Sequence, residues 1–160
     1  MLPERLRSAA AAAVLGAALL ATTACGNPVH LITGGNAIDD YCAALNSHQR
    51  QFADMTSQNS PVALLDARSM FKSLADKAPD DMTDDWQTLL LALDGLQKAL
   101  DHAGVKASDY VDGKPPSTLS TAERKVIAVA ADQLSAQSTV NAVDAIDQEA
   151  RDVCKINLGL

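Results

Sequence analysis

Apolar side chains recur every three or four residues along most of the chain, and no run of alternating β-branched residues interrupts them. This period places apolar side chains on one face of a helix, so the sequence predicts an all-α fold, a single bundle of about five helices. The first helix spans about 20 residues, a usual helix length. Its inward face is expected to comprise Ile38, Tyr41, Cys42, Leu45, Phe52 and Met55.

Two further helices follow, each with a recognisable start and stop. Ser60-Pro61 begins the second, because serine can cap free backbone amides and proline suits the first helical position, and Pro79 ends it after about Lys77. The third begins within residues 80–85 and stops at Gly104. The second helix is expected to turn Leu64, Phe71 and Leu74 inward, and the third Met82, Trp86, Leu89, Leu90, Leu93, Leu96 and Leu100.

An irregular segment, residues 105–118, separates these helices from the last two, since a glycine and two prolines break its pattern. Ser120 and Glu123 have the spacing of a capping box, in which each side chain accepts a bond from a backbone amide. The fourth helix should therefore run from Ser120 to about Leu134. The fifth is expected to follow Ser138, through Val140, Val143, Ile146 and Val153.

The N-terminus has the features of an export signal. Arg5 and Arg7 precede an apolar stretch at residues 9–21, and small residues then lead to Cys25. The stretch is shorter than the roughly 20 apolar residues of a membrane span. We therefore expect a signal peptide over residues 1–24, a lipidated N-terminus and flexible spacer over residues 25–36, and one helical domain over residues 37–160.

Small residues directly before a cysteine, followed by Gly26-Asn27-Pro28, resemble the lipobox of bacterial lipoproteins. The resemblance implies that Cys25 is thioether-linked to diacylglycerol and forms the mature N-terminus. Thr22 stands where that family usually has leucine. Residues 22–24 also suit an ordinary secretory signal, so a secreted protein cut at the same bond is the alternative.

The cysteine count favours the lipid anchor. Cys25, Cys42 and Cys154 are odd in number, and lipidation of Cys25 leaves an even pair. A disulfide between Cys42, near the start of the first helix, and Cys154, near the end of the last, would pin the two ends of the domain together. On the chain-entropy model it contributes roughly 4.8 kcal/mol. A redox-active or metal-binding pair is the alternative, but it lacks C-x-x-C spacing and a neighbouring histidine.

The charge of the chain excludes some partners. Loss of residues 1–24 removes Glu4, Arg5 and Arg7 and changes the formal net charge from −7 to −8. Binding to nucleic acid depends on clustered Lys and Arg, and anionic lipid would repel an acidic domain. We therefore expect no nucleic-acid partner, and contact with the membrane through the lipid on Cys25 alone.

No motif for catalysis or metal binding stands out. The sequence lacks G-x-S-x-G and glycine-rich phosphate loops, and His30, His48 and His102 lack the i, i+4 spacing of a zinc pair. The four acids of residues 80–85 suit helix capping and the helix dipole better than a cation site. We expect no metal, no cofactor and no enzymatic activity.

The contact surface is expected on helix faces or on the loop of residues 105–118. That loop is the candidate binding loop, with Asp109, Tyr110 and Asp112 as its candidate site residues, because irregular loops on a rigid scaffold often carry function. Tyrosine combines apolar area with a polar tip and is enriched at interfaces. The alternative for Tyr110 is a ring that folds back on the helices and holds the loop down. Residues 109–113 read as a turn more readily than as a calcium loop.

Several segments resemble small α-helical lipoproteins of high-GC Gram-positive bacteria. They are the leader ending at Cys25, Asp40-Tyr41-Cys42, residues 78–81 before Asp85-Trp86-Gln87, and residues 150–154. The resemblance implies a disulfide-closed helical domain outside the membrane and assigns no catalytic or binding residue. The expected function is a lipid-anchored module on the extracytoplasmic face of the cell membrane that binds an envelope protein. The alternative is a small-ligand receptor with a pocket between its helices.

Overall fold

The computed structural model describes residues 35–58, 61–111 and 114–160. These residues form six α-helices joined by turns and short 3-10 helices, with no β-strand among them, which confirms the all-α fold. Cys42 and Cys154 are joined by a disulfide with a Cα–Cα distance of 5.1 Å, so the bundle is disulfide-closed as expected. The predicted signal peptide, Cys25 and most of the predicted spacer lie outside the described residues.

The helices begin and end close to the predicted positions. α1 begins at Gly35 rather than at residue 37, a difference within the usual uncertainty of helix ends. The helices are α1 (Gly35–Gln58), α2 (Pro61–Asp66), α3 (Arg68–Ala75), α4 (Thr83–His102), α5 (Thr121–Asp132) and α6 (Gln137–Asp152).

The predicted second helix is divided into α2 and α3, which accounts for six helices instead of five. The backbone of Ala67 opens to φ −77° and ψ −5° between them, while its amide still donates to the carbonyl of Ala63. Ala67 is buried, and the bend at this residue lets both α2 and α3 turn apolar side chains toward the core. The prediction of one helix from Ser60-Pro61 to about Lys77 was therefore wrong for this segment.

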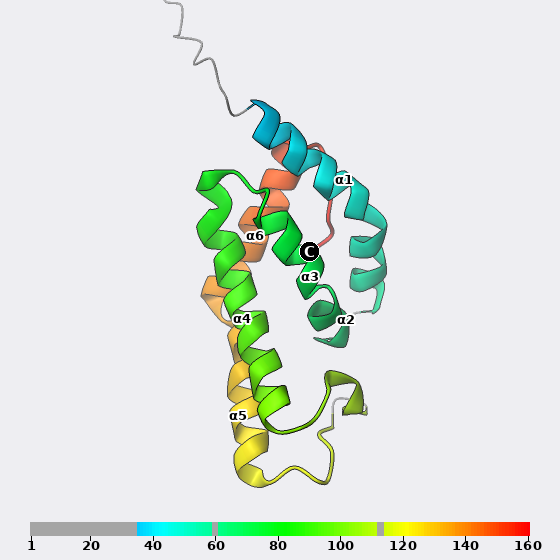
Figure 1. The fold of residues 1–160 in the computed structure, drawn as a ribbon, viewed down its shortest axis with the longest axis vertical. Coiled ribbons are helices and arrows are strands. Elements are labelled where there is room, and N and C mark those ends of the chain that lie inside the picture. The colour runs from blue at the N-terminus through cyan, green and yellow to red at the C-terminus, as the bar shows by residue number, and fades with distance from the viewer. Residues whose placement is uncertain (1–34, 59–60, 112–113) are drawn as a thin grey trace, which may run out of the picture. The chain divides into compact units, whose positions relative to one another are not determined.

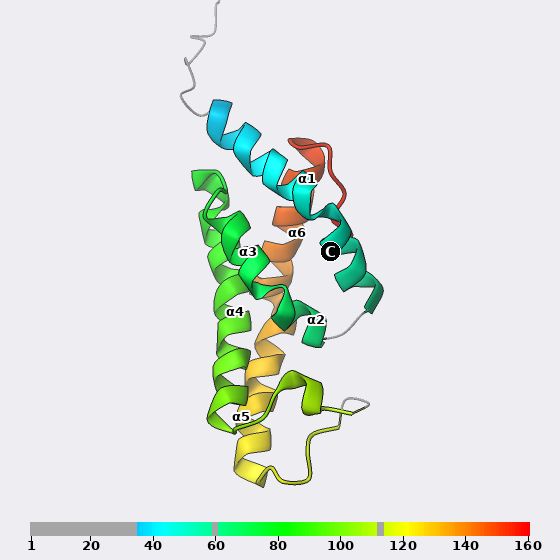
Figure 2. The ribbon, with the colours of Figure 1, turned by 45° about the vertical axis from the view of Figure 1, so that its right-hand side comes forward.

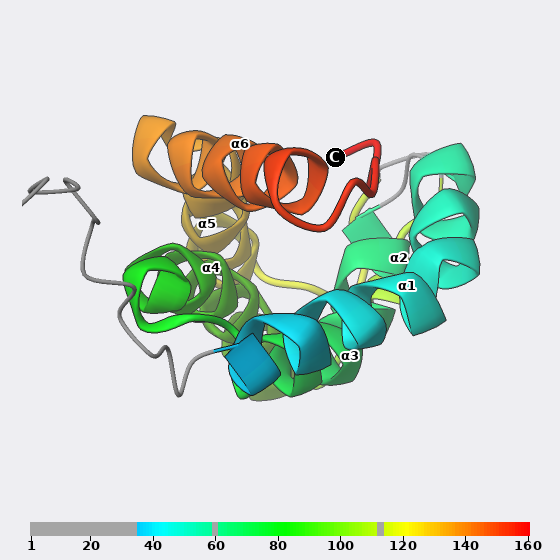
Figure 3. The same cartoon turned by 90° about the horizontal axis from the view of Figure 1, so that it is seen from above.

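α4 lies at the centre of the described fold. α3 packs against it, and α5 and α6 also run along it, one after the other through the 3-10 helix Gln133–Ser135 (Figures 1 and 2). The C-terminal residues pass between α6 and α1 when the fold is seen from above (Figure 3). Four helices, α2, α3, α5 and α6, therefore contact α4.

Aromatic rings form a continuous row through the core. Phe52 of α1 packs on Phe71 of α3, Phe71 packs on Trp86 of α4, and Trp86 meets Tyr41 of α1 edge to face, with centroids 6.1, 6.1 and 6.5 Å apart. Inside this row the indole Nε1 of Trp86 donates a hydrogen bond of 3.1 Å to the Tyr41 hydroxyl. Burial raises the pKa of Tyr41 to about 12, with Glu149 adding to the shift and the Trp86 bond opposing it. The sequence placed these rings in the core, and the structure confirms it.

The ends of α4 and the start of α5 follow the predicted signals. Gly104 has φ 66°, its amide donates to Asp101, and the amide of Val105 donates to Leu100, which is the Schellman arrangement that glycine favours. Ser120 and Glu123 form the expected capping box, and these bonds lower the pKa of Glu123.

The buried face of α6 differs from the predicted valine pattern. Val140 and Val153 are exposed, while Thr139, Ala142, Ile146 and Ala150 are buried. The C-terminal tail was also missed, since Ile156 and Leu158 insert into the core beyond the helix. There the buried Asp147, which also pairs with Arg151, accepts a 3.2 Å bond from the amide of Leu158 and so holds the tail against α6. None of the described helices is long and apolar enough to cross a membrane.

We predict that Tyr41→Phe lowers the free energy of unfolding by about 1–3 kcal/mol, because the fully buried indole N–H of Trp86 then loses its acceptor. Urea denaturation of the purified full chain measures the change. Tyr110→Phe is the matched control, since that tyrosine is only partly buried. Equal stability of Tyr41→Phe and the original chain would show that the bond contributes nothing.

Candidate functional site

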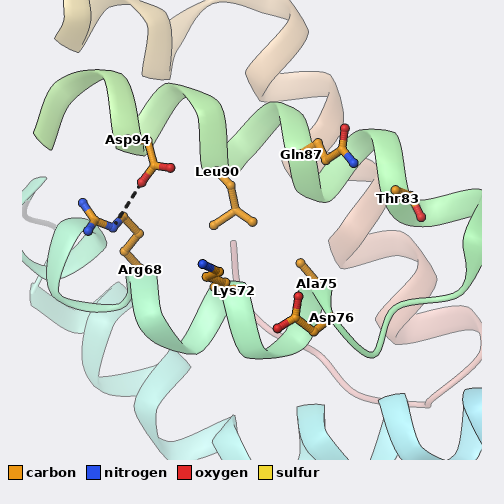
Figure 4. A pocket seen from close by; sticks show the side chains of 8 residues that line it. All are labelled: Arg68, Lys72, Ala75, Asp76, Thr83, Gln87, Leu90 and Asp94. Atoms are coloured by element: carbon orange, nitrogen blue, oxygen red, sulfur yellow. Dashed lines mark ion pairs between the residues drawn. The ribbon is translucent and has the colours of Figure 1, made fainter. Parts of the chain in front are cut away.

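A groove of about 470 Å³ lies between α3 and α4. Each helix lines it with one stripe of side chains at helical spacing. α3 and its C-cap residue supply Arg68, Lys72, Ala75 and Asp76, and α4 supplies Thr83, Gln87, Leu90 and Asp94 (Figure 4). The groove therefore lies on regular elements rather than on the predicted loop.

The two walls meet at one end of the groove in an ion pair. Arg68 Nε lies 3.2 Å from Asp94 Oδ1, and the two side chains are 37% and 48% exposed. A pair so open to water contributes little to stability, so its main effect is to orient both groups. Leu90 projects from α4 into the gap between the helices (Figure 4). Its half-buried side chain gives the groove an apolar middle between polar ends.

The sequence analysis missed this groove. Arg68 and Lys72 lie one helical turn apart in an otherwise acidic chain, and that spacing was the available signal. The packing of α3 against α4 determines which residues of α4 face Arg68 and Lys72. Helical spacing alone does not predict that packing.

The predicted binding loop is held onto the fold. Asp109 accepts a 2.8 Å bond from the amide of Lys106 and so closes a local turn. Tyr110 is half buried against the core, and burial raises its pKa while Arg124 opposes the shift. Its placement favours the alternative in which the ring folds back on the helices. Asp112 lies outside the described residues.

The acids of residues 80–85 lie at the start of α4, as expected for groups that complement the helix dipole. Among the described residues, no three His, Cys, Asp or Glu side chains are grouped so as to hold a metal ion. His48 is in hydrogen-bond contact with Gln51 at 3.2 Å, and His102 lies in the last turn of α4. His30 lies outside the described residues.

A second, smaller hollow of about 130 Å³ lies between α1 and α2. Gln51, Asp54, Met55 and Ala63 are among its lining residues.

We predict that Glu149→Gln stabilises the fold at pH 7. Partial burial, Asp81 and Asp152 raise the pKa of Glu149, so its charged form is disfavoured in the folded state. An acid with a raised folded pKa destabilises the protein above that pKa, and this penalty disappears as the pH falls below the unfolded value. Urea denaturation should show the gain at pH 7 and little difference near about pH 3.

Asp144→Asn, on an exposed position of the same helix, controls for the loss of one negative charge. An equal gain in both variants would contradict a specific effect at Glu149.

Comparison of the chain with protein-family models, with curated proteins and with solved structures found no match. The resemblance to small helical lipoproteins therefore stays an expectation from the sequence.

Proposed function

We propose that this protein is a lipid-anchored binding module on the outer side of the cell membrane that engages a protein partner of the envelope. The Cys42–Cys154 disulfide supports this location outside the cytoplasm, because disulfides form and persist in oxidising compartments. With those two cysteines paired, Cys25 is the remaining thiol, at the position where the leader resembles a lipobox. Two or more acyl chains would hold the domain stably on the membrane, where a single chain would not.

The observation that carries the binding role is the groove between α3 and α4 together with the leucine at its rim. Leu91 is 71% exposed, and its neighbours on the helix surface, Gln87 and Asp94, both line the groove. The lining has cations, carboxylates, an amide and one hydroxyl, but no Cys, His or Ser. The charged and polar side chains of this set can pair with complementary groups on a protein partner.

A small-ligand receptor is the second candidate. The groove has the volume of many ligand sites, and polar side chains converge on it. However, small-molecule sites bury most of the ligand surface, whereas the side chains of Arg68 and Asp94 are 37% and 48% exposed to solvent. A partner that extends beyond the groove therefore fits better.

The anchor is tested by Cys25→Ser. We predict that the original chain sediments with membranes and carries acyl groups on Cys25, and that the variant is released, because the domain would be bound to the membrane by lipid alone. Cell fractionation and mass spectrometry of the mature N-terminus measure both results. A variant that remains on the membrane would refute the anchor.

The binding surface is tested by two matched substitutions. Leu91→Arg at the groove rim and Val111→Arg in the loop change apolar residues of similar exposure, 71% and 68%. We predict that chemical cross-linking in intact cells loses its specific product with Leu91→Arg and keeps it with Val111→Arg. The reverse pattern would assign the partner to the loop of residues 105–118 instead of the helix face.

A further inference from the structure

The outward face of α4 carries a stripe of residues at regular spacing. Its members alternate four and three positions apart, which keeps them on one face of a helix and is the spacing of the contact seam in a coiled coil. They are Asp84, Thr88, Leu91, Gly95, Lys98 and His102, of which Thr88 is half-buried and the others are exposed. α4 runs along one side of the described fold, and its exposed stripe is not covered by any described helix (Figure 1).

Gly95 is the residue of this stripe that the single chain does not explain. Glycine is a poor helix former, yet Gly95 lies well inside a 20-residue helix. Its φ is not in the left-handed region, and a Cβ added there would meet no atom of the described residues within 4 Å. Neither the backbone nor the packing of one copy therefore requires glycine. What glycine does provide is a shallow hollow where another chain can approach closely.

Leu91 is the matching projection. It lies one turn before Gly95 on the same face, and its side chain is 71% exposed. A single exposed leucine is common on protein surfaces. A leucine and an unexplained glycine one turn apart, however, form the knob and the hole that packed helices use.

The stripe is complementary to itself in antiparallel packing. If two copies of α4 pack antiparallel, with a two-fold axis midway between Leu91 and Gly95, the leucine of each copy faces the glycine of the other. The same axis sets Lys98 opposite Thr88, with Asp84 one turn further along. The Thr88 hydroxyl donates to the backbone carbonyl of Asp84, so its oxygen can still accept from an ammonium group.

Charge favours the antiparallel direction over the parallel one. In a parallel pair Asp84 would meet Asp84, and like charges repel. In the antiparallel pair Asp84 lies between Lys98 and His102 of the other copy, and the two helix dipoles oppose each other. Glu123 of α5 also lies near His102, so Lys98 is the main cation that Asp84 meets.

Two further acids of α4 flank the stripe, and each has a partner in its own chain. Asp94 pairs with Arg68, and Asp101 accepts a 2.7 Å hydrogen bond from the side-chain amide of Gln97. Both lie beside the seam and stay in water, which weakens their repulsion of a second copy.

We propose that the protein partner at this face is a second copy of the chain, bound through an antiparallel contact between the two α4 helices. This proposal rests on the proposed binding role and names the partner. A pair of helices about 30 Å long is a small interface, so the dimer is weak in dilute solution. Anchoring both copies to one membrane raises their effective concentration and favours the dimer.

A zero-length cross-linker tests the register of the dimer. The full chain, purified from its membranes, is placed on phosphatidylcholine vesicles and treated with a carbodiimide, which joins a lysine to a carboxylate as an amide. Within one copy Lys98 and Asp84 are 14 positions apart, or roughly 21 Å along the helix, too far to be joined. We expect mass spectrometry to find the Lys98–Asp84 link in a product of twice the chain mass.

Gly95→Gln separates dimer formation from the stability of one copy. The glutamine side chain fills the hollow, so the yield of linked dimer should fall at least tenfold. The thermal midpoint of the dilute chain should instead rise by about 1–3 °C, because glutamine is the better helix former and meets no neighbour. Val111→Arg, an exposed loop position away from α4, should leave the yield unchanged.

Three results would overturn the proposal: no linked dimer on the vesicles, a dimer without the Lys98–Asp84 link, or equal yields from Gly95→Gln and the original chain. A loss of stability in Gly95→Gln would also overturn it, because the glycine would then be required by the single copy. If Leu91→Arg removes a cross-linked product in cells whose mass is not that of two copies, the binding role stands and the second copy is the wrong partner.

Discussion

The disulfide between Cys42 and Cys154 is the constraint on which the rest of the fold depends. It connects the first helix to the end of the last across a sequence separation of 112 residues. On the chain-entropy model, closing a loop of this length stabilises the folded state by roughly 4.8 kcal/mol. This is large beside the free energy of unfolding of a typical domain, roughly 5–15 kcal/mol. Because α1 otherwise packs mainly on α2 and α3, the covalent link is what fixes it to α6.

The buried pair of Trp86 and Tyr41 fixes the orientation of α1, whereas the disulfide only holds α1 close to the end of α6. A disulfide near the start of α1 restrains that helix at one point and leaves its rotation free. The hydrogen bond from the indole N–H fixes the rotation, because any other orientation of α1 would leave a buried donor without a partner. Within the part of the chain that the structure describes, no fully buried side-chain N or O atom lacks a hydrogen bond. The aromatic row is therefore apolar, yet its one hydrogen bond between side chains holds Tyr41 and Trp86 in a defined geometry.

Much of the fold could be predicted from local signals, and the failures have a common cause. The capping box at Ser120 and the stop at Gly104 use backbone geometry that only a few residue types satisfy, so sequence reveals them. The bend at Ala67 has no such signal, since alanine is the strongest helix former and tertiary packing bends the helix there. The tail with Ile156 and Leu158 was missed for the same reason, because it is short, has no period, and is ordered by its contacts with the core and by the carboxylate of Asp147.

The groove also follows from how α3 and α4 are held. α4 is in contact with α3, α5 and α6, and α3 is anchored by its buried Met70, Phe71 and Leu74. Their outward stripes, with Arg68 and Lys72 facing Leu90 and Asp94, are therefore positioned by core packing and not by a ligand. A rigid recognition surface loses little conformational freedom on binding, so more of its contact energy is left for affinity. Anchoring by core packing is why an eight-residue helix, too short to be stable alone, can form one wall of the groove.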